Sequence, residues 1–127
     1  MQAKVGDFGL ARQTDINIEN KTGTILGTSG YIPPEYYSGE ISTKTDVYAF
    51  GVVVLEVLTG LPSFDGRCDS KELVSRMRQT INTNHREMLR WVDKNSGDWP
   101  SAAYFDMSTI AWDSLEKSPN FRPDMDK

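Results

Sequence analysis

The stretch that most constrains the fold is the apolar segment at residues 47–58, within "TDVYAFGVVVLEVLTG". Its only charged residue is Glu56, and it is too short to span a bilayer, which takes about 20 apolar residues. Ser42-Thr43 offers an N-cap, while Gly60 followed by Pro62 provides a stop. Periodicity alone also allows a buried strand, but the length and the caps favour a buried central helix over about residues 43–59.

Composition narrows the class of protein. The 127 residues are 38% hydrophobic and 25% charged, as in an ordinary soluble globular segment. A net charge of −4 gives no basic footprint, so we expect no nucleic-acid partner. The single cysteine, Cys68, excludes an internal disulfide and a cysteine-based zinc site. Since no charged-then-apolar leader opens the chain, we expect a cytoplasmic location and no membrane insertion by this segment.

The flanking sequence predicts one long loop followed by helices. Residues 3–12 read as a short strand, and residues 14–30 are rich in Thr, Asn and Gly, which is typical of a long functional loop. Asp69 and Glu72 are predicted as a capping box ahead of a helix with apolar residues at helical spacing. Further apolar residues predict a shorter helix around Met88, Leu89 and Val92. Helical spacing then recurs at Tyr104, Met107, Ala111 and Leu115. The expected fold class is therefore mostly α.

Five landmarks follow one another in a characteristic order. They are Asp7-Phe8-Gly9, Gly27-Thr28, "YIPPE" ending at Glu35, "DVYAFG" beginning at Asp46, and "RPD" beginning at Arg122. Their order and spacing are similar to the second half of a eukaryotic protein kinase domain. Within the kinases, "AKVGDFGLAR", "GEISTKTDVYAFGVVVLEVLTGLP" and "EKSPNFRPDM" resemble the Pelle and interleukin-receptor-associated group. Plant receptor-like kinases share much of this pattern.

The resemblance implies a partial kinase domain over residues 1–127, a C-terminal lobe truncated at both ends. The DFG segment and activation loop would occupy residues 4–35, the central buried helix about residues 43–59, and the remaining lobe helices about residues 70–127. The chain has no glycine-rich loop, no strand lysine with its helix glutamate, and no His-Arg-Asp catalytic loop. We therefore expect the isolated chain to be inactive, and the full-length protein to use ATP and Mg²⁺.

The resemblance assigns chemistry to the first four site residues. Asp7 would supply carboxylate oxygen to the magnesium ions that bridge the triphosphate; the alternative is a loop-capping aspartate. Phe8 would pack under the regulatory helix of the other lobe, and Gly9 would let the loop swing. Thr28 would place a hydroxyl beside the catalytic aspartate, which favours Ser/Thr specificity; the alternative is a turn threonine.

Other residues would hold or regulate the site. Asp46 would hydrogen-bond the catalytic-loop backbone, or serve only as a first-turn acid favoured by the helix dipole. Glu35 and Arg122 would pair across the lobe; the alternative is two solvated surface charges. Thr22 and Thr24 are candidate phosphosites, because a phosphate there would order the loop by bonding to an arginine.

The expected function is that of a serine/threonine kinase segment acting on protein substrates, in Toll- or interleukin-receptor-type innate immune signalling. A receptor–adaptor complex is a candidate partner. The alternatives are a pseudokinase, a truncated scaffold or interaction module, and another receptor-like kinase. Sequence upstream in the same protein would separate these readings, since catalysis requires an aspartate in the catalytic loop and a strand lysine.

Overall fold

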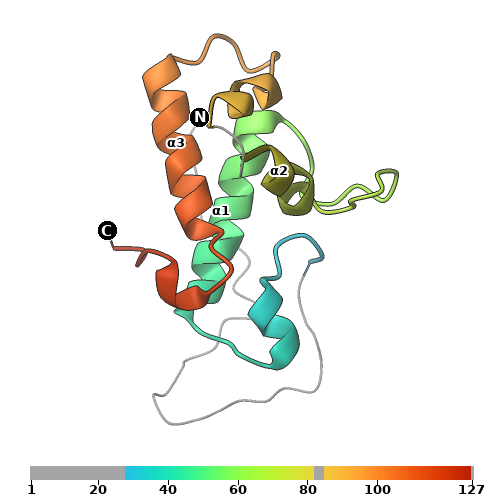
Figure 1. Cartoon of the computed structure of the whole chain (residues 1–127), viewed down its shortest axis with the longest axis vertical. Helices are drawn as coiled ribbons and strands as arrows, with labels where there is room; N and C mark the ends of the chain where they lie inside the picture. The colour runs from blue at the N-terminus through green and yellow to red at the C-terminus, as the bar shows by residue number, and fades with distance from the viewer. Residues whose placement is uncertain (1–27, 82–84, 127) are drawn as a thin grey trace.

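The computed structural model describes residues 28–81 and 85–126, and every regular element within these ranges is helical (Figure 1). In chain order the elements are η2 (Pro34–Ser38), α1 (Thr43–Thr59), α2 (Leu73–Ile81), η3 (His85–Trp91), α3 (Ser101–Ser114) and η4 (Pro119–Phe121). The strand expected at residues 3–12 and most of the loop expected at residues 14–30 lie outside the described residues. The mostly helical class therefore holds for the part that is described.

Helix α1 has the bounds that its sequence predicts, and its ends explain why. At the N-terminus the Ser42 hydroxyl accepts a hydrogen bond from the Lys44 amide at 3.2 Å, and the Thr45 hydroxyl accepts one from the Ser42 amide at 3.4 Å. This reciprocal pair is a capping box. At the C-terminus Gly60 adopts φ +65°, and its amide donates to the Glu56 carbonyl at 2.8 Å. Ser42 and Gly60, which the sequence predicts as the ends of this helix, therefore act as its caps in the structure.

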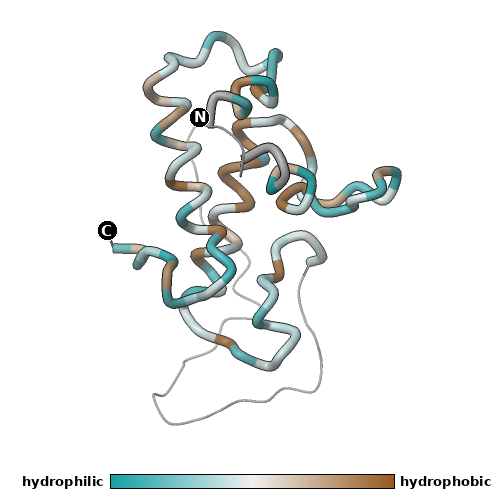
Figure 2. The backbone as a smooth tube through the Cα atoms, in the orientation of Figure 1, coloured by the Kyte–Doolittle hydropathy of each residue, from teal (hydrophilic) through white to brown (hydrophobic). Residues whose placement is uncertain are grey.

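The core forms where α1 packs against α3, which runs alongside it (Figure 1). The apolar character of α1 is visible along most of its length in Figure 2. The Tyr104 hydroxyl of α3 is buried and donates to the Met88 carbonyl of η3 at 2.7 Å, which ties η3 to the same core. Fully or almost fully buried side chains from these elements include Val52, Leu55, Leu58, Met88, Tyr104 and Ala111, and Leu115 directly after α3 is buried as well.

The predicted capping box at Asp69 and Glu72 is wrong. Helix α2 begins at Leu73, so Glu72 precedes the helix instead of occupying its first turn. Glu72 instead forms an isolated antiparallel bridge with Phe64. The Leu73 amide donates to the Ser63 carbonyl at 2.8 Å. Backbone pairing with the loop after α1 therefore fixes where α2 starts, and side-chain spacing could not reveal that pairing.

Gly51 sets the distance between α1 and α3. A Cβ atom at this position would lie 2.8 Å from Ser114 Cβ, 2.9 Å from Leu115 Cγ and 3.0 Å from the Ala111 carbonyl oxygen. Such distances are shorter than van der Waals contact, and the Ala111 oxygen belongs to the backbone. The two helices must therefore separate to admit even one methyl group.

We predict that Gly51→Ala lowers the free energy of unfolding of the chain. Helix propensity favours alanine by about 0.8–1.0 kcal/mol, but overpacking a close contact costs about 1–3 kcal/mol. Urea unfolding followed by far-ultraviolet circular dichroism measures the balance. Val53→Ala is the matched control, because Val53 lies on the same helix with 45% of its surface exposed and should change little. If Gly51→Ala instead raises the free energy of unfolding by about 1 kcal/mol, helix propensity alone acts at this position and the contact between α1 and α3 is not tightly packed.

Candidate functional site

Four of the residues singled out by sequence lie in the described part of the chain: Thr28, Glu35, Asp46 and Arg122. The other site residues expected from the sequence lie outside the described residues, namely Asp7, Phe8, Gly9, Thr22 and Thr24. The site that can be built atom by atom is therefore the segment from Thr28 to Glu35 together with the helices that hold it.

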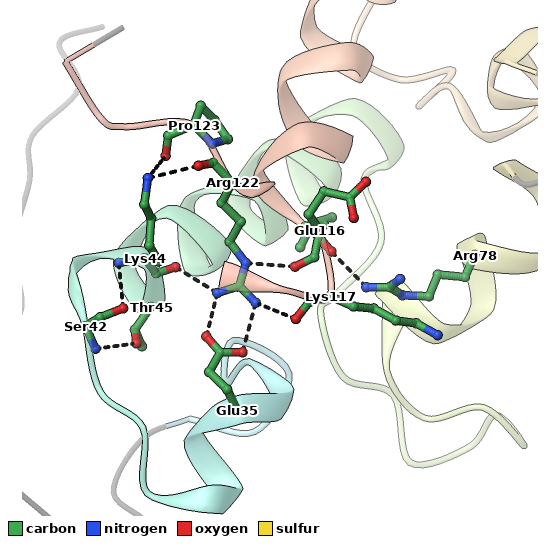
Figure 3. A network of polar contacts seen from close by, with 10 residues as sticks. Glu35, Ser42, Lys44, Thr45, Arg78, Glu116, Lys117, Arg122 and Pro123 are labelled. Carbon is green, nitrogen blue, oxygen red and sulfur yellow. Dashed lines mark hydrogen bonds and ion pairs between the residues drawn. The ribbon is translucent and has the colours of Figure 1, made fainter. Parts of the chain in front are cut away.

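Glu35 and Arg122 form a shielded, two-pronged ion pair although 87 residues separate them (Figure 3). Arg122 Nη1 lies 2.5 Å from Glu35 Oε1, and Arg122 Nη2 lies 2.9 Å from Glu35 Oε2. The Arg122 side chain is 0% exposed and that of Glu35 is 8% exposed. Parallel N–H···O bonds of this kind require the planar fork of a guanidinium group. The surface-charge alternative for these two residues does not fit this geometry.

Every N–H group of the Arg122 guanidinium has an acceptor. Besides the two bonds to Glu35, Nε donates to the Glu116 carbonyl at 2.8 Å and Nη1 to the Lys44 carbonyl at 3.0 Å. Nη2 donates to the Lys117 carbonyl at 3.4 Å. An arginine has five such N–H groups, so its hydrogen-bonding capacity is filled. The arrangement meets the condition under which a buried charge is tolerated, which is a charge partner plus complete hydrogen bonding.

Two arginines also donate hydrogen bonds to backbone carbonyls at the C-terminal end of α3, a helix that has no basic residue in its last turn. Arg122 bonds the carbonyls that follow the helix, as described above, and Arg78 of α2 donates to the Leu115 carbonyl at 2.8 Å. Cationic side chains stabilise the negative end of a helix dipole and its unpaired carbonyls. Arg122 therefore connects Glu35, α1 and the end of α3 in one cluster (Figure 3).

Tyr48 and Lys44 of α1 complete this cluster. The guanidinium carbon of Arg122 lies 4.9 Å from the centre of the Tyr48 ring, and burial raises the pKa of Tyr48. Lys44 Nζ donates to the carbonyls of Arg122 and Pro123 at 2.9 and 3.0 Å and pairs with Asp124 at 2.5 Å. Lys44 and Arg122 thus each donate to the backbone of the other. Sequence reasoning missed Lys44, although a cation in the first turn of a helix opposes the dipole and so signals another partner.

A second anchor lies at the other end of the Thr28–Glu35 segment. The Tyr31 amide donates to the Thr28 carbonyl at 3.2 Å, which closes a turn whose third residue, Gly30, has φ +99°. The Tyr31 hydroxyl donates to Glu56 Oε2 at 2.6 Å, and the Ser63 amide donates to Glu56 Oε1 at 2.6 Å. Thr28 itself is exposed. The turn therefore presents Thr28 to solvent while Tyr31 is held to α1.

Asp46 lies in the first turn of α1 and is exposed. This position suits the favourable interaction of an acid with the helix N-terminus. Its expected bond to a catalytic-loop backbone involves residues that this chain does not contain, so that role stays a prediction.

The described residues contain no group of three or more His, Cys, Asp or Glu side chains arranged to hold a metal ion. No helix among them has both the length and the apolar character needed to cross a membrane.

Comparison with known proteins gives matches along the whole chain. The protein kinase domain family matches residues 1–127. A probable LRR receptor-like serine/threonine-protein kinase of Arabidopsis thaliana is 34% identical, over 98% of this chain and 14% of the relative. LysM domain receptor-like kinase 10 of Oryza sativa subsp. japonica is 35% identical, over 98% of this chain and 22% of the relative. Serine/threonine-protein kinase PBL13 of Arabidopsis thaliana is 35% identical, over 97% of this chain and 26% of the relative.

The chain thus spans between 14% and 26% of the length of these three relatives. The match extends over the residues that carry the five sequence landmarks, including the two that form the buried ion pair. The chain belongs to the protein kinase family.

Proposed function

We propose that this chain provides the activation segment and the helices of the C-terminal lobe in a serine/threonine kinase. The complete protein transfers the γ-phosphate of ATP to serine or threonine in protein substrates. The observation that carries the proposal is the saturated Arg122–Glu35 pair, which fixes the end of the Thr28–Glu35 segment against α1 and α3. Membership of the protein kinase family and the names of the relatives, two of which are serine/threonine-protein kinases, support the same reaction class.

Phosphoryl transfer suits a site of this kind because its catalysis is mostly positioning and charge neutralisation. Thr28 is exposed at one end of a segment anchored at both ends, through Tyr31 to Glu56 and through Glu35 to Arg122. An exposed hydroxyl on a fixed turn can orient the hydroxyl of an incoming substrate. We therefore propose that Thr28 is the residue that positions the substrate.

The metal and nucleotide part of the proposal rests on sequence. Asp7 offers the carboxylate oxygen that Mg²⁺ prefers, within the Asp7-Phe8-Gly9 motif. When bound, the ion supplies charge neutralisation on the phosphate oxygens of ATP. Phe8 would pack against the other lobe, and Gly9 would give the backbone freedom next to the ligand.

The subgroup and the pathway belong to the proposal as well. The sequence motifs favour the Pelle and interleukin-receptor-associated group, in cytoplasmic innate immune signalling with protein substrates and a receptor–adaptor complex. Two of the relatives above are named receptor-like kinases. A receptor-like kinase is therefore the second candidate, supported by those matches. The remaining alternative is a pseudokinase that scaffolds such complexes. An activity assay decides between the two, because a pseudokinase transfers no phosphate.

We predict that the full-length protein phosphorylates a protein substrate with ATP and magnesium, and that Asp7→Asn reduces this transfer to background. The amide keeps the shape of the carboxylate but loses the charge that holds the metal. Phosphate incorporation into serine and threonine is the measurement. Asp106→Asn is the matched control, because Asp106 is exposed on α3 and should leave activity unchanged.

The isolated 127-residue chain should show only background in the same assay, because it lacks the catalytic base and the strand lysine. Turnover by the isolated chain that Asp7→Asn abolishes would contradict the expected inactivity. A full-length protein that binds receptor complexes but transfers no phosphate would instead establish the scaffold reading.

We further predict that phosphorylation at Thr22 or Thr24 activates the full-length kinase. A phosphate adds about 1.5 to 2 negative charges at pH 7 and strong acceptor oxygens, which can order a loop by pairing with an arginine. Mass spectrometry of the active protein should find phosphate on one of these threonines. Changing both threonines to alanine should lower activity. Thr14→Ala is the control within the same segment and should leave activity unchanged. Full activity of the Thr22→Ala/Thr24→Ala variant would remove this idea.

A further inference from the structure

Lys44 is a lysine in a position where its own helix gains nothing from it. It lies in the first turn of α1, where a cation opposes the helix dipole. The capping of that turn is already provided by the side chains of Ser42 and Thr45. The favourable contacts of Lys44 must therefore come from outside α1.

The ammonium group of Lys44 binds one short stretch of chain after η4. Figure 3 shows it reaching the carbonyls of Arg122 and Pro123, at 2.9 and 3.0 Å, and it also donates to Asp124 Oδ1 at 2.5 Å. An ammonium group has three N–H donors, so its hydrogen-bonding capacity is filled. Arg122 has extended backbone, with φ −73° and ψ 142°, and follows the last residue of η4. Lys44 therefore holds a non-helical backbone to the start of α1.

The Arg122 side chain is held by the same residue at its other end. Arg122 Nη1 donates to the Lys44 carbonyl at 3.0 Å and also binds Glu35 Oε1. Lys44 thus fixes the backbone of Arg122 with its side chain and the guanidinium with its own backbone. A two-pronged pair with a carboxylate depends on the direction of the guanidinium plane. Contacts at both ends of the arginine set that direction.

The ion pair between Lys44 and Asp124 is the weaker part of this arrangement. The Asp124 side chain is 52% exposed and that of Lys44 is 22% exposed. Exposed ion pairs contribute little to stability because water and salt screen them. The Arg122 side chain, by contrast, is 0% exposed. We therefore assign the effect of Lys44 to its two carbonyl bonds, which lie next to the buried guanidinium.

We propose that Lys44 is a positioning residue, which holds the backbone at Arg122 and Pro123 so that the Arg122 guanidinium faces Glu35. The inference rests on the proposed kinase function, in which Glu35 ends the segment that presents Thr28. Lys44 acts through Arg122 and not through a contact with the substrate. Its loss lets the guanidinium turn away from Glu35, which loosens the Thr28–Glu35 segment and slows the step that involves the protein substrate.

The kinetic test compares Lys44→Met with Asp124→Asn in the full-length kinase. Lys44→Met removes all three bonds, whereas Asp124→Asn removes only the charge of the ion pair. Losing hydrogen bonds from a charged donor should lower kcat with a protein substrate on the order of tenfold in Lys44→Met, with no change in the KM for ATP. Asp124→Asn should keep nearly full activity. Lys94→Met is the control for the substitution itself, because Lys94 is exposed.

Two kinetic outcomes would overturn the positioning role. Equal losses of kcat in Lys44→Met and Asp124→Asn would show that the ion pair matters and the carbonyl bonds do not. An unchanged kcat in Lys44→Met would show that Arg122 keeps its direction without Lys44.

The Arg122 Nε proton provides a readout that a general loss of stability would not reproduce. This proton is bonded to the Glu116 carbonyl at 2.8 Å, and its exchange with water can be followed by NMR. In the complete kinase domain, Lys44→Met should speed this exchange on the order of tenfold. The Gly60 amide, which is bonded to the Glu56 carbonyl at the other end of α1, should keep its rate. Equal acceleration at both protons would indicate global destabilisation and reject the positioning role.

Proton exchange also separates this inference from the proposed function, because it does not depend on activity. Unchanged exchange at Arg122 Nε together with normal kcat in Lys44→Met would reject the role of Lys44 and leave the proposed function intact. If the full-length protein transfers no phosphate, the proposed function fails, while faster exchange at Nε alone would still support the orienting of Arg122 by Lys44.

Discussion

The buried guanidinium of Arg122 is the interaction on which the described structure depends. Removing a charged group from water costs several kcal/mol, so the group is stable only where a counter-charge and a full set of acceptors surround it. Glu35 supplies the counter-charge, while the carbonyls of Lys44, Glu116 and Lys117 supply the other acceptors. These acceptors come from three regions of the sequence. The cluster is complete only when the Thr28–Glu35 segment, the start of α1 and the end of α3 meet.

Each of the two anchors of the Thr28–Glu35 segment is a hydrogen bond in which a carboxylate joins the segment to a residue that is distant in sequence. At one end an arginine from the C-terminal region reaches a carboxylate in the segment, and at the other a carboxylate on α1 reaches a tyrosine in the segment. Both anchors depend on α1, whose position is set by its packing against α3 at Gly51. The apolar core therefore determines where the segment can lie, and the polar groups fix it there. An arrangement of this kind suits the substrate-positioning role that we propose for Thr28.

Sequence could predict the parts whose signals are local or belong to a family pattern. The bounds of α1 follow from Ser42 and Gly60, and the order of landmarks pointed to Glu35 and Arg122 as partners. Lys44 and Glu56 were missed as anchors because their partners lie far away in sequence, at 78 and 25 residues. A lone charge beside or within an apolar helix indicates that a partner exists but does not identify it.

The error at α2 has a related cause. Asp69 and Glu72 have the spacing of a capping box, yet the bridge between Phe64 and Glu72 places the start of the helix after them. Backbone pairing across the loop outweighs the side-chain signal because it satisfies backbone N–H and C=O groups on both sides of the bridge. The roles expected for Asp7, Phe8 and Gly9, and the phosphosites at Thr22 and Thr24, stay predictions because these residues lie outside the described part of the chain.

A double-mutant cycle on Glu35 and Arg122 tests the central claim most directly. The free energy of unfolding would be measured by denaturant titration in a complete kinase domain that contains this segment. If the pair is buried and saturated, Glu35→Ala and Arg122→Ala should each cost about 3–5 kcal/mol, because each leaves an uncompensated charge. The double variant should then cost far less than the sum of the two. Single losses below about 1 kcal/mol that simply add would show an exposed pair and would contradict the account.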